Sequence, residues 1–155
     1  DLVNLFRSEI AFCTFQSATA HADGGLRFSG SSSGLYVHDN QWTGANDMSH
    51  KVGIQADGAN FDSCRFENNQ IRASDVGIGI SINTNIADNT VFKSNVIHGG
   101  RPGLALGVND LSTAGMAIFA GNYIAATKSN VLSNRGEERW IANLWKNGFA
   151  AVNAS

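Results

Sequence analysis

A six-residue pattern recurs along the chain and constrains its fold more than any other feature. It consists of an apolar residue, two variable residues, Asn, one variable residue and a second apolar residue, and it occupies residues 37–42, 66–71, 92–97, 119–124 and 140–145. Residues 10–15 keep both apolar ends but have Cys13 in place of the Asn. Successive copies lie 21 to 29 residues apart. A unit of this length cannot bury its own apolar face, so it must stack on copies of itself.

Stacked units rich in β-favouring residues predict an all-β solenoid, a parallel β-helix of about six coils. Residues 1–155 are expected to form a single β-helix domain, cut from a larger chain. Leucine-rich repeats have a similar period, but their closely spaced leucines and helical segment are missing. In a β-sandwich the repeat would be accidental. The Asn recurs in five of the six copies, which argues against that alternative.

The recurring Asn has a physical reason to be there. It tolerates the left-handed bend between two strands, and its amide can bond to the equivalent amide one coil away. The predicted ladder consists of Asn40, Asn69, Asn95, Asn122 and Asn143.

Apolar residues are expected to fill the interior in stacks of like residues. The predicted stacks are Phe66 on Phe92 on Phe119, and Ile71 on Ile97 on Ile124. A second element, Gly followed by alternating apolar residues, is expected to start a strand of each coil. It places these side chains inward: Leu26, Phe28, Ile54, Ile78, Ile80, Leu104 and Leu106.

The segments 29–34 and 45–51 are rich in turn-forming residues and are expected to be exposed loops. Cys13 and Cys64 have no metal-ligand spacing and are interpreted as buried free thiols. Trp42 and Trp145 occupy the last apolar position of the pattern and are expected in the core.

Charge and composition exclude several classes of partner. Charged residues make up 15% of the chain and the formal net charge is −2. The chain therefore lacks the excess of positive charge that attracts nucleic-acid phosphates or anionic membranes. We therefore expect neither nucleic acid nor a membrane as partner. The sequence indicates no metal site and no cofactor.

The repeat length, the Asn column and the like-on-like stacks resemble the pectate-lyase-type right-handed β-helix superfamily. The long Ser- and Gly-rich segments resemble its phage tailspike members. The resemblance covers residues 10–149. It implies a right-handed solenoid, a polysaccharide substrate and a location that is extracellular or on a virion surface. The polygalacturonase motifs are incomplete, since residues 83–85 read Asn-Thr-Asn where the family has Asn-Thr-Asp.

Candidate chemistry lies where outward-facing residues align on successive coils, about 4.8 Å apart. Four places before the last apolar position, His38, Glu67 and Lys93 form one column, and Tyr36 and Arg65 flank it. Glu67 and His38 are the candidate catalytic acid and base, while Tyr36, Arg65 and Lys93 would bind an acidic sugar. The alternative is a charge ladder on a solvated face. A two-carboxylate hydrolase would need a second acid, and this column holds one.

A second candidate lies in the bend at residues 98–103. His98 and Arg101 are interpreted as further substrate-binding residues, with a simple loop as the alternative.

Two functions stay open on the sequence alone. One is a depolymerase, a lyase or glycoside hydrolase that acts on a bacterial surface or acidic polysaccharide. The other is a non-catalytic glycan-binding or structural segment of a tailspike or adhesin. Without capping helices, the apolar ends of the solenoid would need covering by a larger chain or by partner copies, as in a homotrimer.

Overall fold

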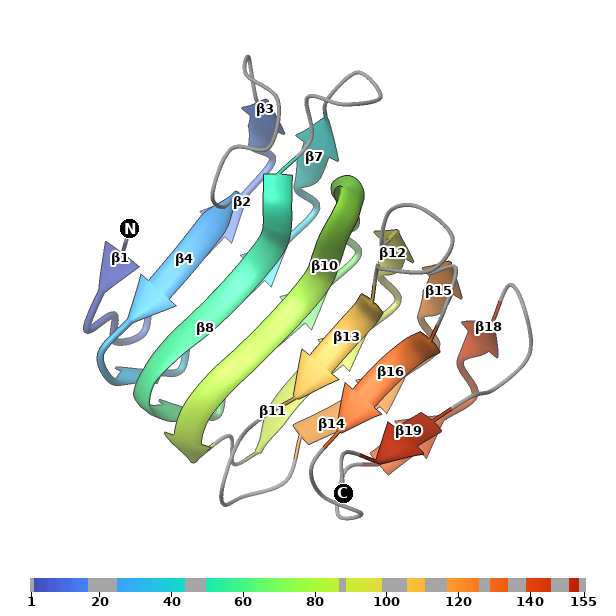
Figure 1. Ribbon diagram of the computed structural model, residues 1–155. Helices are drawn as coiled ribbons and strands as arrows, with labels where there is room; N and C mark the ends of the chain where they lie inside the picture. The colour runs from blue at the N-terminus through green and yellow to red at the C-terminus, as the bar shows by residue number, and fades with distance from the viewer. Residues whose placement is uncertain are drawn as a thin grey trace.

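The computed structural model describes residues 2–16, 25–43, 50–86, 89–98, 106–110, 117–125, 129–133, 139–145 and 151–153. These residues form strands and short connections, with no helix among them (Figure 1). Every strand pairing within this part of the chain is parallel. The all-β prediction is therefore confirmed for the described residues.

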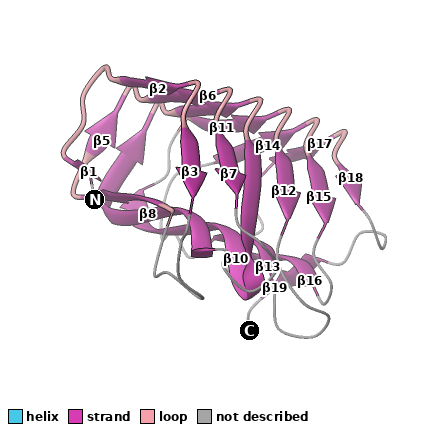
Figure 2. Cartoon of the chain, turned by 90° about the horizontal axis from the view of Figure 1, so that it is seen from above, coloured by secondary structure: helices cyan, strands magenta, loops and turns pink. Residues whose placement is uncertain are grey.

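A six-stranded parallel sheet contains the first half of each repeat. In spatial order its strands are β2 (Glu9–Ala11), β6 (Tyr36–His38), β9 (Arg65–Glu67), β11 (Thr90–Lys93), β14 (Ala117–Ala120) and β17 (Arg139–Ile141). Figure 2 shows β2, β6, β11, β14 and β17 following one another along one side of the molecule. Each of the four inner strands therefore pairs with the equivalent strands of the repeats before and after it, and β2 and β17 form the edges.

The second sheet contains thirteen strands and follows a branched path. Its main path runs through β1 (Leu2–Val3), β4 (Leu26–Ser29), β8 (His50–Asp62), β10 (Gln70–Ile86), β12 (Val96–His98), β15 (Tyr123–Ala125) and β18 (Leu144–Trp145). The branches are β3 (Thr14–Gln16), β5 (Ser32–Ser33), β7 (Gln41–Thr43), β13 (Leu106–Asp110), β16 (Ser129–Ser133) and β19 (Ala151–Asn153).

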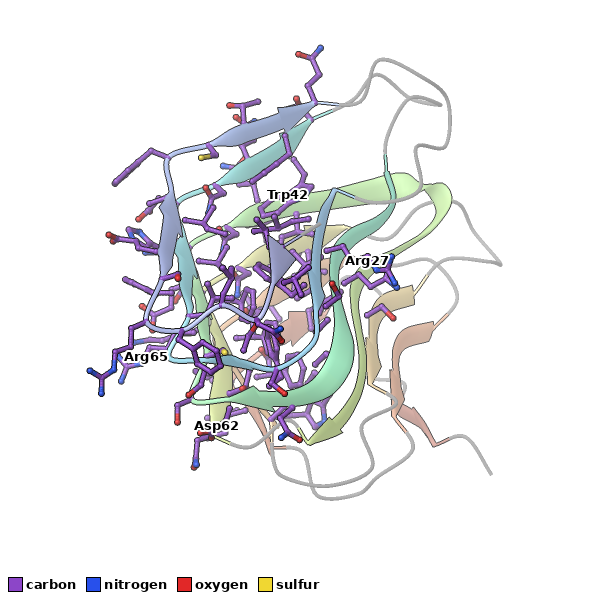
Figure 3. The ribbon with its side chains drawn as sticks, turned by 90° about the vertical axis from the view of Figure 1, so that its left-hand side faces the viewer. Arg27, Trp42, Asp62 and Arg65 are labelled. Atoms are coloured by element: carbon purple, nitrogen blue, oxygen red, sulfur yellow. The ribbon has the colours of Figure 1, made fainter. Side chains whose placement is uncertain are left out.

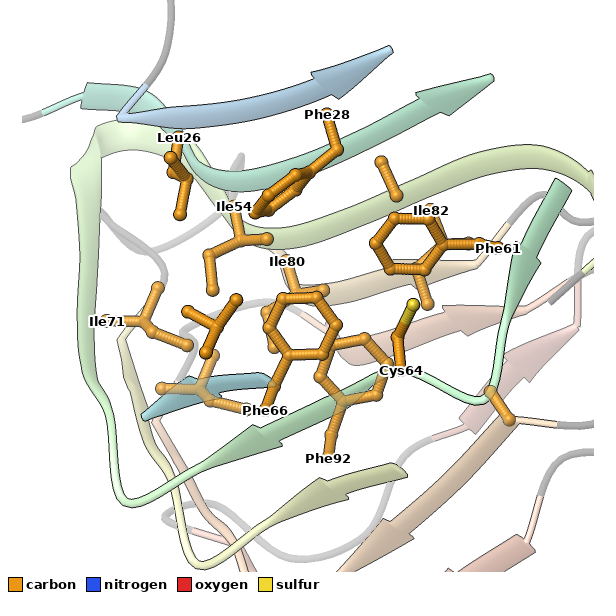
Figure 4. Packing of buried hydrophobic residues seen from close by; sticks show 14 of the residues in the cluster. Leu26, Phe28, Ile54, Phe61, Cys64, Phe66, Ile71, Ile80, Ile82 and Phe92 are labelled. Carbon is orange, nitrogen blue, oxygen red and sulfur yellow. The ribbon is translucent and has the colours of Figure 1, made fainter. Parts of the chain in front are cut away.

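The predicted stacks form the core. Phe66, Phe92 and Phe119 are in register and fully buried, with ring centroids 4.7 and 4.8 Å apart. The predicted isoleucine stack is likewise in register and buried. Figure 4 shows Phe66 and Phe92 facing the side chains of the opposite sheet. The inward positions of Leu26, Phe28, Ile54 and Ile80 are also confirmed, whereas the side chains of Ile78, Leu104 and Leu106 lie outside the described residues.

The Asn ladder is confirmed along its whole length. Nδ2 of each of the first four Asn donates to the Oδ1 of the Asn in the next repeat, over 2.9–3.0 Å. The backbone N–H of the same Asn donates to that same Oδ1. The remaining Nδ2 hydrogen reaches a carbonyl of the preceding repeat, as from Asn95 to Phe66 at 2.9 Å. The interior amides are thus buried with their hydrogen-bonding groups satisfied.

The predicted position of the left-handed bend was wrong by one residue. The positive φ angles, 50° to 59°, belong to the residue before each Asn, and before Cys13 in the first repeat. These six bend residues are Phe12, Asp39, Asn68, Ser94, Gly121 and Ala142. The Asn is needed for its side-chain hydrogen bonds, and its neighbour makes the turn.

Three further local predictions need correction. Segment 29–34 is not a plain exposed loop, because Ser32 is buried and β5 pairs with Phe61 and Asp62. The predicted loop 45–51 ends early, since β8 begins at His50. Cys13 is exposed, while Cys64 is buried as expected, and its burial raises the pKa of the thiol to about 11.

Of the recurring glycines within the described residues, Gly25 alone marks a strand start as predicted. Gly53 and Gly77 lie inside β8 and β10, and Gly103 lies outside the described residues. Gly25 precedes β4, and there the reason for Gly is space: a Cβ would stand 2.3 Å from Nε1 of Trp42. Trp42 itself is buried as expected, and the side chain of Trp145 is outside the described residues.

Candidate functional site

The six-stranded sheet presents alternate residues outward, and two aligned columns form the candidate site. His38, Glu67 and Lys93 are in register on β6, β9 and β11. Tyr36 and Arg65 are in register two residues earlier. Figure 3 shows the Arg65 side chain pointing outward from the molecule, whereas Trp42 lies in the interior. The structure therefore brings the five sequence-predicted residues of these columns together on one face.

His38 is the best-connected side chain of this face. Its Nδ1 lies 2.6 Å from Oδ2 of Asp39, and its Nε2 lies 2.7 Å from Oε1 of Glu9. The Tyr36 ring stacks on the imidazole at 4.1 Å, and the Phe12 ring meets it edge-on at 5.6 Å. We call Glu9, Tyr36, His38 and Asp39 the His38 cluster.

Two carboxylates facing two ring nitrogens favour the doubly protonated imidazolium. A neutral ring has one N–H and would leave one carboxylate facing a lone pair. The hydrogen bond to Asp39 raises the pKa of His38 above 6.5, the bond to Glu9 raises it further, and burial opposes both. The arrangement thus favours His38 as a cation, and both of its ring nitrogens are engaged within the protein.

This protonation state predicts a pH dependence. Because the folded-state pKa lies above the unfolded value of 6.5, the stabilisation is fully present below pH 6.5 and is lost as the pH rises through the folded-state pKa. Urea unfolding at a series of pH values should show this loss in the wild type and a flatter profile in His38→Gln. NMR titration of the imidazole provides the direct check, with Asp39→Asn lowering the pKa more than Glu9→Gln. A wild-type value at or below 6.5 would contradict the assignment.

Glu67 is connected to the same cluster through Tyr36. The Tyr36 hydroxyl donates to Oε2 of Glu67 over 3.2 Å. Burial and this hydrogen bond, in that order, raise the pKa of Tyr36 above 10.0, so the phenol is protonated at neutral pH. The hydroxyl thus orients one oxygen of Glu67, and the carboxylate retains further lone pairs for another ligand.

Arg65 and Lys93 are exposed on this face. Neither forms a salt bridge with another of the described residues. Arg65 lies directly opposite Tyr36 and Lys93 directly opposite Glu67. The two cations therefore stand beside the Tyr36–Glu67 pair.

The remaining predicted residues lie apart from this face or cannot be placed. His98 ends β12 in the other sheet, where its backbone is in register with Arg72 and Ala125. Arg101 lies outside the described residues. Within the described ranges no group of three or more His, Cys, Asp and Glu side chains is arranged to hold a metal ion. No helix among these residues is long and apolar enough to span a membrane.

Sequence reasoning missed the roles of Glu9 and Asp39. Glu9 belongs to the same outward column as Tyr36, and Asp39 directly follows His38, so both were within reach of a register argument. The His38–Glu67–Lys93 column holds the one carboxylate expected of it, and Glu9 from the neighbouring column and Asp39 from the bend add two more to the same face. Only the side-chain conformations show that both carboxylates turn toward the same imidazole.

Comparison with known proteins gives no significant match: no family model, no curated protein and no solved structure matches this chain.

Proposed function

We propose that this chain is a right-handed parallel β-helix module of about six coils that acts as a depolymerase on a bacterial surface or acidic polysaccharide, by a lyase or glycoside hydrolase reaction. The observation that carries the proposal is the outward face on which Tyr36 of the His38 cluster binds Glu67, beside Arg65 and Lys93, which form no salt bridge with another described residue. A polymer could cross several repeats of this face at once.

The solenoid assignment is supported by the pairing pattern. In both sheets each strand pairs with the equivalent strand of the next repeat, and the Asn ladder follows the same order. A chain that returns to the same sheet through a parallel crossover does so with a right-handed connection in nearly all proteins. These two arguments favour a right-handed solenoid.

The proposed roles follow from the contacts. Glu67 is the acid or base, because it is the carboxylate that Tyr36 orients beside the cations Arg65 and Lys93, while Glu9 and Asp39 face His38. Arg65 and Lys93 bind acidic groups of the polymer, and His38 supports Tyr36 by stacking and supplies a fixed positive charge. Glu9 or Asp39 would supply the second carboxylate of a hydrolase. His98 and Arg101 remain proposed outer binding residues, and the proposed location is extracellular or on a virion surface.

A non-catalytic glycan-binding or structural segment is the second candidate. It is favoured by the engagement of both His38 nitrogens within the protein. Exposed apolar residues at both ends of the stack also fit a segment covered by more chain or by copies in a homotrimer. These are Val3, Phe6 and Phe12 at one end and Ile141 and Leu144 at the other.

The Glu67→Gln variant tests the proposal. Incubation with polygalacturonate, alginate and purified capsular and O-antigen polysaccharides should shorten one polymer in the wild type. In Glu67→Gln the turnover should fall roughly 10²- to 10⁴-fold, because the acid or base is lost while the shape is kept. Polymer length and the ultraviolet absorbance of unsaturated uronates are followed together, which separates a lyase from a hydrolase.

Asp62→Asn is the matched control. It removes a carboxylate at the end of β8, where Asp62 accepts a hydrogen bond from Ser63, outside the proposed site. Its turnover should equal that of the wild type. Shortening that survives Glu67→Gln would place the reaction elsewhere, and binding without shortening of any polymer would favour the second candidate.

A further inference from the structure

Phe12 is exceptional among the six bend residues. All six have left-handed backbone angles, and the other five are Asp, Asn, Ser, Gly and Ala. Left-handed φ angles are tolerated best by Gly, Asn and Asp and are rare for bulky side chains. Phe12 has a φ of 56° in the same bend. The backbone at this point therefore gives no reason for a phenylalanine.

Core packing gives no reason for it either. Phe12 is 80% exposed, more than any other large apolar residue among those the structure describes. The ring contacts the His38 imidazole at an interplanar angle of 82°, and this contact leaves most of the side chain in solvent. Strained and exposed residues of this kind concentrate where a protein binds something.

The position of Phe12 connects it with the proposed site. It directly follows β2 and lies against His38, whose other contacts are Glu9, Asp39 and Tyr36. From Phe12 the cluster continues through Tyr36 to Glu67. An aromatic surface thus borders the polar columns at the first repeat.

We propose that Phe12 is a sugar-stacking residue: its exposed ring packs against the apolar C–H face of one sugar ring of the polysaccharide. This inference rests on the proposed function. The electron-rich face of an aromatic ring attracts the weakly positive C–H groups of a sugar, and it desolvates an apolar surface at little entropic cost because the side chain has two torsions. The ring fixes the position of the polymer, and the charged columns bind its acidic groups.

The test uses Phe12→Asn and Phe12→Trp, with Ala142→Asn as the matched control. Ala142 occupies the same bend of the last described repeat, with a φ of 50° and an exposed side chain. Asn fits the left-handed bend, so both Asn variants should keep or raise the melting temperature, by up to roughly 2–4 °C. Affinity for whichever of polygalacturonate, alginate, capsular or O-antigen polysaccharide the wild type binds is measured by calorimetry.

Phe12→Asn should weaken binding about tenfold, Phe12→Trp should retain it and Ala142→Asn should leave it unchanged. Saturation transfer from the Phe12 ring to sugar protons should be seen in the wild type and lost in Phe12→Asn. Unchanged affinity in Phe12→Asn, or a change in mass by light scattering with no change in affinity, would overturn the inference alone. Absence of wild-type binding to all four polymers would instead overturn the proposed function and this inference with it.

Discussion

Asn95→Ala is expected to lower the free energy of unfolding by roughly 3–6 kcal/mol, since it would leave several buried polar groups without partners. The Asn95 side chain accepts hydrogen bonds from the backbone N–H and Nδ2 of Asn69 and donates to the Phe66 carbonyl and to Oδ1 of Asn122. Ala can replace none of these, and the surrounding amides are closed to solvent. Each unsatisfied buried group costs about 1–3 kcal/mol.

Urea unfolding followed by circular dichroism measures this loss, with Asn143→Ala as control. Asn143 has the same contacts to the preceding repeat, but it is half-exposed and is the last Asn of the ladder, so water can replace its partners. We expect a loss of about 1–2 kcal/mol there. Equal losses at the two positions would contradict the argument, because burial would then have no part in the cost.

The parts of the fold that were predictable from sequence are those that recur. A shift of one residue in the alignment of a repeat would move its Asn and its apolar residues out of their columns together. Five copies of the Asn and three of the Phe therefore support one alignment of the repeats. That is why the ladder and the stacks of Phe66, Phe92 and Phe119 were found without a structure. Features that occur once had no such support. The burial of Ser32, the exposure of Cys13 and the contact of Gly25 with Trp42 all depend on single side chains.

In the candidate site, too, the recurring features were predictable from sequence and the single side-chain contacts were not. Alignment placed His38, Glu67 and Lys93 in one column, because a column depends on backbone register alone. The hydrogen bonds of His38 to Glu9 and Asp39 depend on side-chain torsions that register does not determine. Sequence reasoning assigned His38 an acid or base role, and these bonds favour a fixed cation.

The phenylalanine stack should be the second large contributor to stability. Phe92→Ala is expected to lower the free energy of unfolding by roughly 3–5 kcal/mol, through lost transfer energy and the cavity left between two rings. The Phe92 ring lies nearly parallel to those of Phe66 and Phe119, at interplanar angles of 11° and 6°. All three rings are buried, so no solvent-exposed side chain can turn inward to fill the cavity that Phe92→Ala would leave.

Phe92→Leu separates packing from ring stacking. It keeps most of the apolar volume, so the loss should be smaller than that of Phe92→Ala: less than about 1.5 kcal/mol for the change of shape, plus the stacking contribution, which starts at about 0.5 kcal/mol for each ring pair. Phe6→Ala is the control for phenylalanine itself, since Phe6 is 63% exposed and should cost less than about 1 kcal/mol. Urea midpoints at an unchanged m-value provide the comparison. A Phe92→Ala loss no larger than that of Phe6→Ala would contradict this expectation. It would mean that the neighbouring repeats shift to fill the cavity, despite the register that their strand pairs share.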